Sequence, residues 1–142
     1  MTERLDLTAS RNETWQPTID YVYGGAALPL TGATARMQWR LYDGAAGSAL
    51  IDLVDVPYED DPATADDIAQ GWAREGDRIL RLSPTIAVAT LAGLPTGLNQ
   101  PEPGEADRYT WDIVITYSDG LQDRLLAGFV LIFLSIILSE TH

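Results

Sequence analysis

Residues 109–133, YTWDIVITYSDGLQDRLLAGFVLIF, decide the fold class of this chain. From Tyr109 to Tyr117, apolar side chains alternate with mostly polar ones, which is the period of a half-buried β-strand. Asp119-Gly120 follows as a turn dipeptide that tolerates positive φ, and the chain then returns through a second apolar segment. The pattern predicts an antiparallel hairpin in which residues 109–117 pair with residues 121–133.

Upstream segments predict further strands. Residues 34–42 alternate in the same way, and residues 49–56 resume the apolar pattern after a glycine-containing loop, which together predict a second hairpin. Another strand is expected within residues 13–23, where Pro17 removes a backbone donor and so favours an edge strand or a bend. Residues 77–82 predict one more strand.

Helical signals are short and few. Ser83-Pro84 is typical of a helix start, which predicts about two helical turns over residues 85–92. We interpret residues 58–74 as an acidic insertion with room for a short helix near residues 64–72. Five acids lie within residues 59–67 but lack the spacing of a calcium-binding loop, so we expect a solvated surface and no metal site there.

Together, these strand and helix patterns predict the fold class. About seven strands with turns between them and one short helix describe a mainly β protein, an antiparallel Ig-like β-sandwich. The chain has 142 residues, of which 46% are apolar and 21% charged, so we expect a single domain. We place an N-terminal arm at residues 1–12 and the sandwich at residues 13–142. Alternating apolar residues in the arm suit it to add a strand to a neighbour's sheet.

The composition argues against most catalytic chemistry. Nine arginines, no lysine and 21 acidic residues give a net charge of −12, so no nucleic-acid partner is expected. The chain has no cysteine, which excludes a thiolate metal site. Its single histidine is the last residue, His142, which argues against a Ser-His-Asp triad. We therefore expect a protein that is not an enzyme and that binds no cofactor.

One apolar run raises the question of a membrane. Residues 125–138, LLAGFVLIFLSIIL, form a run of 14 residues, whereas a membrane-spanning helix needs about 20. Its β-branched residues and Gly128 favour a buried strand, so no membrane association is expected. The first residues also lack the basic-then-apolar order of a secretory signal, so we do not expect export by that route.

The end of this run predicts an interface. Successive side chains of a strand point to opposite faces, so odd positions from 129 to 133 face one way and even positions from 130 to 134 the other. A sandwich core takes only one set, and we expect the other to be covered by another chain or by a segment of this one. Trp15 and Trp72 have polar neighbours and are also expected on a contact surface. The candidate assembly residues are Phe129, Val130, Leu131, Ile132, Phe133, Leu134, Trp15 and Trp72.

Four short motifs resemble a known family. LTGATARMQWR at residues 30–40 is followed by YTWDIVIT at 109–116, by SDG at 118–120 and by RLLAG at 124–128. This order resembles the small β-sandwich structural proteins of tailed bacteriophages and prophages, which are similar to the N-terminal domain of phage baseplate upper proteins. The resemblance covers residues 15–130.

The resemblance implies a non-enzymatic virion structural protein that acts through protein–protein assembly. A tail or baseplate adaptor is expected first, and a head or neck accessory protein second. The implied partners are other virion proteins and copies of the chain, in a particle assembled in the bacterial cytoplasm. The residues themselves leave an alternative open: a carbohydrate-binding or receptor-contact module, in which the loop carrying Trp72 and the proline-rich residues 100–104 touch a ligand.

Overall fold

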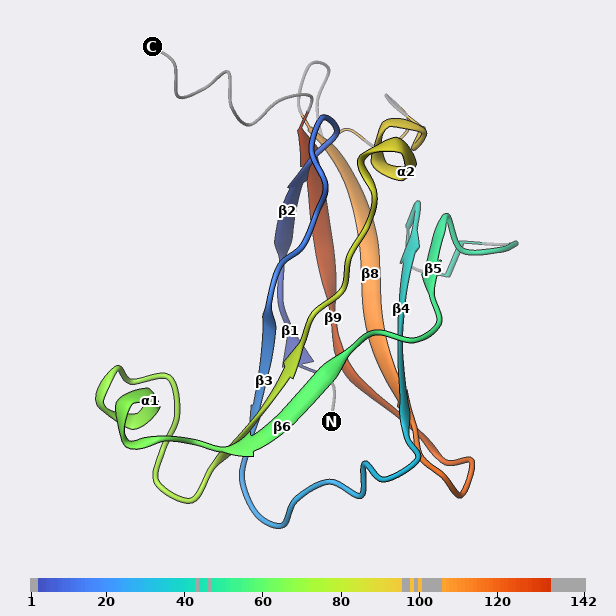
Figure 1. Cartoon of the computed structure of the whole chain (residues 1–142). Helices are drawn as coiled ribbons and strands as arrows, with labels where there is room; N and C mark the ends of the chain where they lie inside the picture. Colours follow the sequence, from blue (N-terminus) through green and yellow to red (C-terminus); the bar gives the residue numbers. More distant parts are fainter. Residues whose placement is uncertain are drawn as a thin grey trace.

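The computed structural model describes residues 3–42, 44–45, 47–95, 98, 100 and 106–133, which form two β-sheets packed around one core (Figure 1). The elements of this part, in chain order, are β1 (Glu3–Arg4), β2 (Leu7–Ser10), β3 (Ile19–Tyr23), β4 (Thr34–Arg40), β5 (Ile51–Leu53), β6 (Tyr58–Pro62), α1 (Ala65–Ala69), β7 (Arg78–Leu82), α2 (Val88–Ala92), β8 (Asp107–Thr116) and β9 (Gln122–Phe133). The prediction of a mainly β fold is confirmed, with more strands and one more helix than expected. Among the described residues, no helix has the length and apolar character that crossing a membrane requires.

The large sheet has the order β1-β9-β8-β4-β5, and β2 also pairs with β9. Its centre is the hairpin of β8 and β9, which is closed by a turn in which the N–H of Tyr117 donates to the carbonyl of Leu121 over 2.8 Å. β4 pairs antiparallel with β8, and β5 pairs antiparallel with β4. Both predicted hairpins are therefore confirmed.

A register shift between β8 and β9 resets the alternation of β9. It lies at Ile113 and Val114 of β8, where one extra residue of β9 is accommodated. As a result, the adjacent residues Leu125 and Leu126 are both buried. Beyond the shift, even-numbered residues of β9 point to the core and odd-numbered residues point outward.

The N-terminal residues belong to the large sheet. β1 and β2 run parallel to β9, so the sheet is mixed rather than purely antiparallel. Between them the chain kinks at Leu5, whose carbonyl oxygen accepts a 3.0 Å hydrogen bond from the indole Nε1 of Trp111. Residues 3–10, which we expected in an arm that pairs with a neighbour's sheet, pair instead with this chain's own β9.

The small sheet has the order β3-β7-β6, and its pairs are antiparallel. Its edge strand β6 comes from the acidic segment that we predicted as an insertion. α1 follows within the same segment and begins with a capping box, in which Thr64 and Asp67 each bond the other's backbone N–H, at 2.8 and 3.1 Å. Residues 58–74 thus build part of the fold, and the predicted helix is present over a shorter range.

α2 starts later than the Ser83-Pro84 motif predicts. Its N-cap position is occupied by Ala87, whose side chain makes no capping bond. Just upstream, Ile86 forms an isolated β-bridge with Trp15, and the two residues exchange backbone hydrogen bonds of 2.9 and 3.0 Å. Because the side chain of Ile86 is also buried, tertiary contacts hold this residue extended and override the local helix-start signal.

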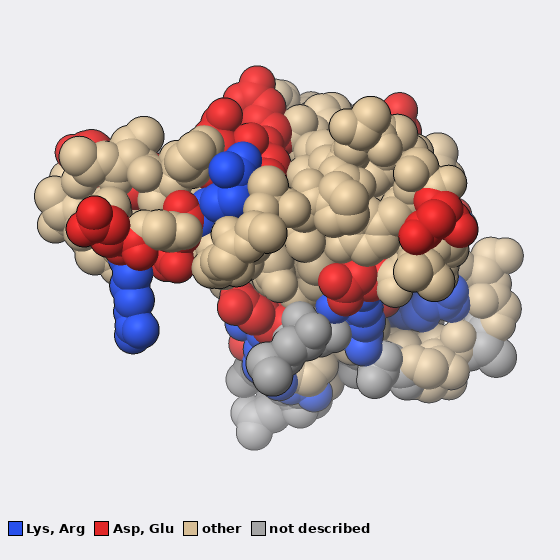
Figure 2. Space-filling view, turned by 90° about the horizontal axis from the view of Figure 1, so that it is seen from below, with Lys and Arg blue, Asp and Glu red and all other residues tan. Residues whose placement is uncertain are grey.

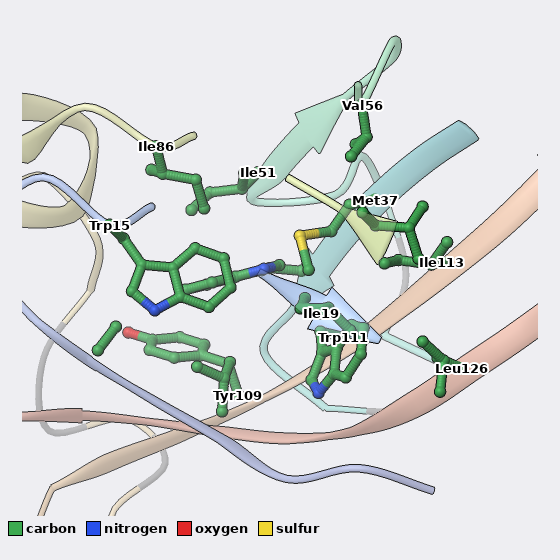
Figure 3. Close-up of a cluster of buried hydrophobic side chains, with 14 of the residues drawn as sticks. Trp15, Ile19, Met37, Ile51, Val56, Ile86, Tyr109, Trp111, Ile113 and Leu126 are labelled. Carbon is green, nitrogen blue, oxygen red and sulfur yellow. The ribbon is translucent and has the colours of Figure 1, made fainter. Parts of the chain in front are cut away.

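The core fills the space between the two sheets, and Figure 3 shows its tryptophans surrounded by aliphatic side chains from both. Trp39 of β4 is fully buried, and its ring meets that of Trp15 edge-on at a centroid distance of 5.1 Å. Every second residue of β8, from Asp107 to Ile115, is buried. The same alternation decides which side chains remain outside the large sheet.

Candidate assembly surface

The outer face of the large sheet is formed by the side chains that alternate with core residues in β4, β8 and β9, together with neighbours from β1 and β5. We call it the outer sheet face. It carries five of the nine arginines of the chain. Its arginines are Arg4, Arg36, Arg40, Arg108 and Arg124, its acids are Glu3, Asp6, Asp52 and Asp112, and its apolar strip is Phe129, Leu131 and Phe133.

The apolar strip is the outward half of the strand that we predicted to be two-sided. Val130 and Ile132 are buried in the core, with 0% and 1% of their surface exposed. Phe129 and Leu131 are half-buried, and Phe133 is 38% exposed. β9 is therefore apolar on both faces: one face packs in the core, and the described chain covers the other only in part. Leu134, the last residue of the predicted interface, lies outside the described residues.

Two arginines cover Phe129. The guanidinium carbons of Arg4 and Arg108 lie 4.8 and 4.5 Å from the centroid of its ring, which is the range of a cation–π contact. The backbone N–H of Phe129 also donates to the carboxylate of Asp6 over 2.9 Å. This hydrogen bond is the main reason that the pKa of Asp6 lies below its usual range. The N-terminal strands thus hold Phe129 in place on the outer sheet face.

Ion pairs fix most of the charged side chains of this surface. Arg36 donates to both carboxylate oxygens of Asp52, at 2.7 and 2.5 Å, and this pairing lowers the pKa of the Asp52 carboxyl. Arg124 lies 3.2 Å from Asp112, and Arg4 lies 3.3 Å from Asp6. Such half-exposed pairs contribute little to stability. Five arginines against three aspartates and Glu3 nevertheless leave the face with a net charge of +1 in a chain whose net charge is −12.

A shallow hollow of about 280 Å³ lies beside Phe129. Arg4, Arg124 and Glu3 lie on its walls, and Thr110 contributes a hydroxyl. Its apolar lining comes from Phe129, Ala127 and part of Trp111. The hollow offers apolar contact, arginine guanidinium groups and a hydrogen-bonding group within reach of one inserted side chain.

The segment that begins with the small sheet's edge strand β6 forms a second distinctive surface. We call residues 58–77 the acidic lobe; it comprises β6, α1 and the loop to β7. It holds seven acids and one arginine, a net charge of −6. In Figure 2 this lobe projects at the left and carries acidic side chains. Trp72, in the loop after α1, is 61% exposed.

Some acids of this lobe have structural roles. The hydrogen bond from the N–H of Thr64 is the main reason that the pKa of Asp67 is lowered. Asp67 also lies 3.4 Å from Arg81, and Asp60 lies 3.2 Å from Arg78. Allowing for these two pairs, the lobe still presents a strongly negative surface around Trp72.

The predicted site residues do not form one patch. Trp15 is in the core, only 8% exposed, and its indole Nε1 donates to the carbonyl of Thr8 over 2.9 Å, so it is not the surface residue that we expected. Trp72 is exposed as predicted, but it lies next to α1, which contacts the outward-facing Arg81 of the small sheet. The apolar strip and Trp72 therefore lie on the outer sides of different sheets.

Sequence reasoning missed Arg4 and Arg108 as neighbours of Phe129. Arg108 could have been found, because the hairpin register places it opposite Leu131 on the same face as Phe129. Arg4 could not, since the parallel pairing of β1 with β9 leaves no turn signal in the sequence.

No group of three or more Asp, Glu or His side chains within the described ranges is arranged to hold a metal ion. The chain matches no family model and no curated protein. Functional inference therefore starts from the two surfaces and from the sequence motifs.

Proposed function

We propose that this chain is a non-enzymatic structural protein of a phage or prophage virion, which acts through protein–protein assembly. The observation that carries the proposal is the apolar strip on the outer sheet face, because a row of partly exposed apolar side chains on a sheet face is typical of an interface. The motif order from residues 30 to 128, which resembles small phage β-sandwich proteins, supports the same class. A tail or baseplate adaptor is the first candidate, and a head or neck accessory protein is the second.

The strand order supports the finer proposal of an Ig-like connectivity. Variable-type Ig domains place the strands named C, F and G, with C′, in one sheet and B, D and E in the other. Here β4, β8, β9 and β5 share one sheet, and β3, β6 and β7 share the other, in the same chain order. Tyr109, near the start of β8, hydrogen bonds through its hydroxyl to the carbonyl of Pro95, which is similar to the tyrosine corner of such domains.

The energetics require the strip to be the centre of a larger contact. Fully burying three such side chains contributes at most roughly 1.5–3 kcal/mol each, and two of them are already half-buried. Association costs about 4–15 kcal/mol in lost translational and rotational freedom. The strip therefore needs the surrounding arginines, and a partner surface of matching charge, to give a stable assembly.

The proposal is tested in the particles themselves. After induction of a lysogen that carries the gene, we expect quantitative mass spectrometry of purified particles to find the chain at a fixed copy number. Recovery only from the cytoplasmic fraction would overturn the proposal.

A matched pair of variants tests the surface. Leu131→Asp should prevent incorporation into particles, while Leu121→Asp, at a turn residue that is 66% exposed and distant from the strip, should not. Both variants should remain folded by circular dichroism. Equal incorporation of the two would show that the strip is not the interface.

The exposure of Trp72 favours one second candidate, a carbohydrate-binding or receptor-contact module. That function predicts binding on a glycan array that Trp72→Ala abolishes and that Leu131→Asp leaves unchanged. The absence of glycan binding, together with loss of Leu131→Asp from particles, would support assembly through the outer sheet face.

A further inference from the structure

We propose that the acidic lobe of one copy docks onto the outer sheet face of the next copy, with the indole of Trp72 inserted into the hollow beside Phe129. The inference rests on the proposed function and deepens it, because it names the partner of the outer sheet face as a second copy of this chain.

Charge complementarity points to this partner. The outer sheet face has a net charge of +1, and the acidic lobe has a net charge of −6. Two copies that approach through their other surfaces meet acid against acid in a chain of net charge −12. The lobe-to-face orientation replaces that repulsion with attraction, so electrostatics select it during encounter.

The two surfaces also match in apolar chemistry. Trp72 is one of the most exposed large apolar side chains among the described residues, at 61%. The hollow of about 280 Å³ offers the ring of Phe129 and two arginines, Arg4 and Arg124, which outnumber its one acid, Glu3. Tryptophan and arginine are the residues that most often dominate binding energy at interfaces, and an indole is the best aromatic partner of a guanidinium. Asp66 and Glu75, both exposed and close to Trp72 in the chain, would then meet the arginines around the hollow.

The placement of the surfaces decides the symmetry. Because they lie on the outer sides of different sheets, each copy uses one surface toward one neighbour and the other surface toward a second neighbour. Such a contact is head-to-tail, and it generates a closed ring or an open filament rather than a two-fold dimer.

A mixing experiment separates this arrangement from every symmetric one. Sedimentation velocity should show that the wild-type chain associates and that raising the salt from about 0.1 to 1 M weakens the association, because the Debye length falls from ~10 to ~3 Å. Trp72→Ala disables the lobe, and Leu131→Asp disables the face. Each variant alone should lose association by about 30-fold or more in the association constant.

A mixture of the two variants should form a one-to-one dimer and nothing larger, since one intact lobe and one intact face remain. Leu121→Ala, at a 66% exposed turn residue outside both surfaces, is the control and should associate like the wild type. A mixture that stays monomeric, or a wild-type chain that is monomeric at about 1 mM, would overturn the inference. If particles contain the chain but the mixture stays monomeric, the docking of lobe onto face is wrong and the proposed virion function stands. A dimer in the mixture without incorporation into particles would remove the proposed function instead.

Discussion

The backbone carbonyl of Leu5 lies directly over the α-carbon of Gly128. A Cβ atom at position 128 would lie 2.7 Å from the carbonyl carbon of Leu5 and still closer to its oxygen, which no side chain tolerates. The close approach lets the Leu5 oxygen reach the indole Nε1 of Trp111, and lets Asp6 accept from the N–H of Phe129. One glycine therefore admits the N-terminal strands to the large sheet and, through them, positions Phe129.

Gly128→Ala should destabilise the fold by about 3 kcal/mol or more, because the clash is with backbone and the N-terminal strand must move. Urea denaturation measures the loss. Gly93→Ala is the matched control: its φ is −83°, and its nearest neighbour would lie 3.5 Å from the new Cβ, so we expect a change of at most about 1 kcal/mol. Equal stability of the two variants would contradict the packing described at Leu5.

The sequence predicts those parts of the fold whose signals lie within one continuous stretch of the chain. The hairpin of β8 and β9 was predictable because both its period and its Asp119-Gly120 turn lie in one continuous stretch. Gly128, inside an apolar strand, was a visible sign of a close backbone approach. The segment that approaches it lies more than a hundred residues away, and a parallel pairing leaves no turn to reveal it.

At Trp15 and at Ser83-Pro84, tertiary contacts override the structure that the local sequence predicts. The polar neighbours of Trp15 suggested exposure, yet its bridge to Ile86 places the ring against Trp39 in the core. The same bridge delays α2 beyond the predicted start. For the candidate site, strand alternation correctly separated Leu131 from Ile132, but the arginines that cover Phe129 required the three-dimensional structure.

Arg11 and Asp107 form a buried pair that ties the end of β2 to the start of β8. The guanidinium lies 2.9 Å from the Asp107 carboxylate and donates to the carbonyls of Leu94 and Pro95, each at 2.8 Å. Both side chains are less than a tenth exposed, so Arg11→Ala removes the ion pair of a buried carboxylate.

We expect Arg11→Ala to cost about 3–5 kcal/mol in the free energy of unfolding. Arg36→Ala removes an ion pair whose side chains are 49% and 35% exposed, and it should cost much less, because water screens this pair. Chemical denaturation of both variants provides the comparison. If Arg36→Ala is as damaging as Arg11→Ala, burial is not what makes the Arg11 pair important.

The capping box of α1 predicts an acid-dependent contribution to stability. The pKa of Asp67 in the folded chain lies below its ordinary value of 3.8, mainly because its carboxylate accepts from the N–H of Thr64. Its stabilising contribution is therefore fully present above about pH 4 and is lost as the pH falls through the folded-state pKa.

Asp67→Asn should flatten the dependence of unfolding free energy on pH between about pH 5 and 3, since asparagine does not titrate. Asp66→Asn, at the exposed neighbour in the same helical turn, should follow the wild-type profile more closely. Urea titrations at several pH values measure both profiles. Parallel profiles for Asp67→Asn and the wild type would mean that the capping carboxylate does not carry this dependence.

The two faces of β9 predict opposite outcomes for adjacent substitutions. Ile132 is 1% exposed and packs in the core, so Ile132→Asp places a carboxylate among apolar side chains without a partner and should unfold the chain. Leu131 points to the outer sheet face, where a carboxylate can reach water, so Leu131→Asp should keep the fold with only a small loss of stability. Thermal unfolding followed by circular dichroism distinguishes the two.

The folded Leu131→Asp variant should then fail to associate, because it brings a negative charge to the surface that meets the acidic lobe. If both substitutions unfold the chain, the strip is part of the core and the assembly surface lies elsewhere.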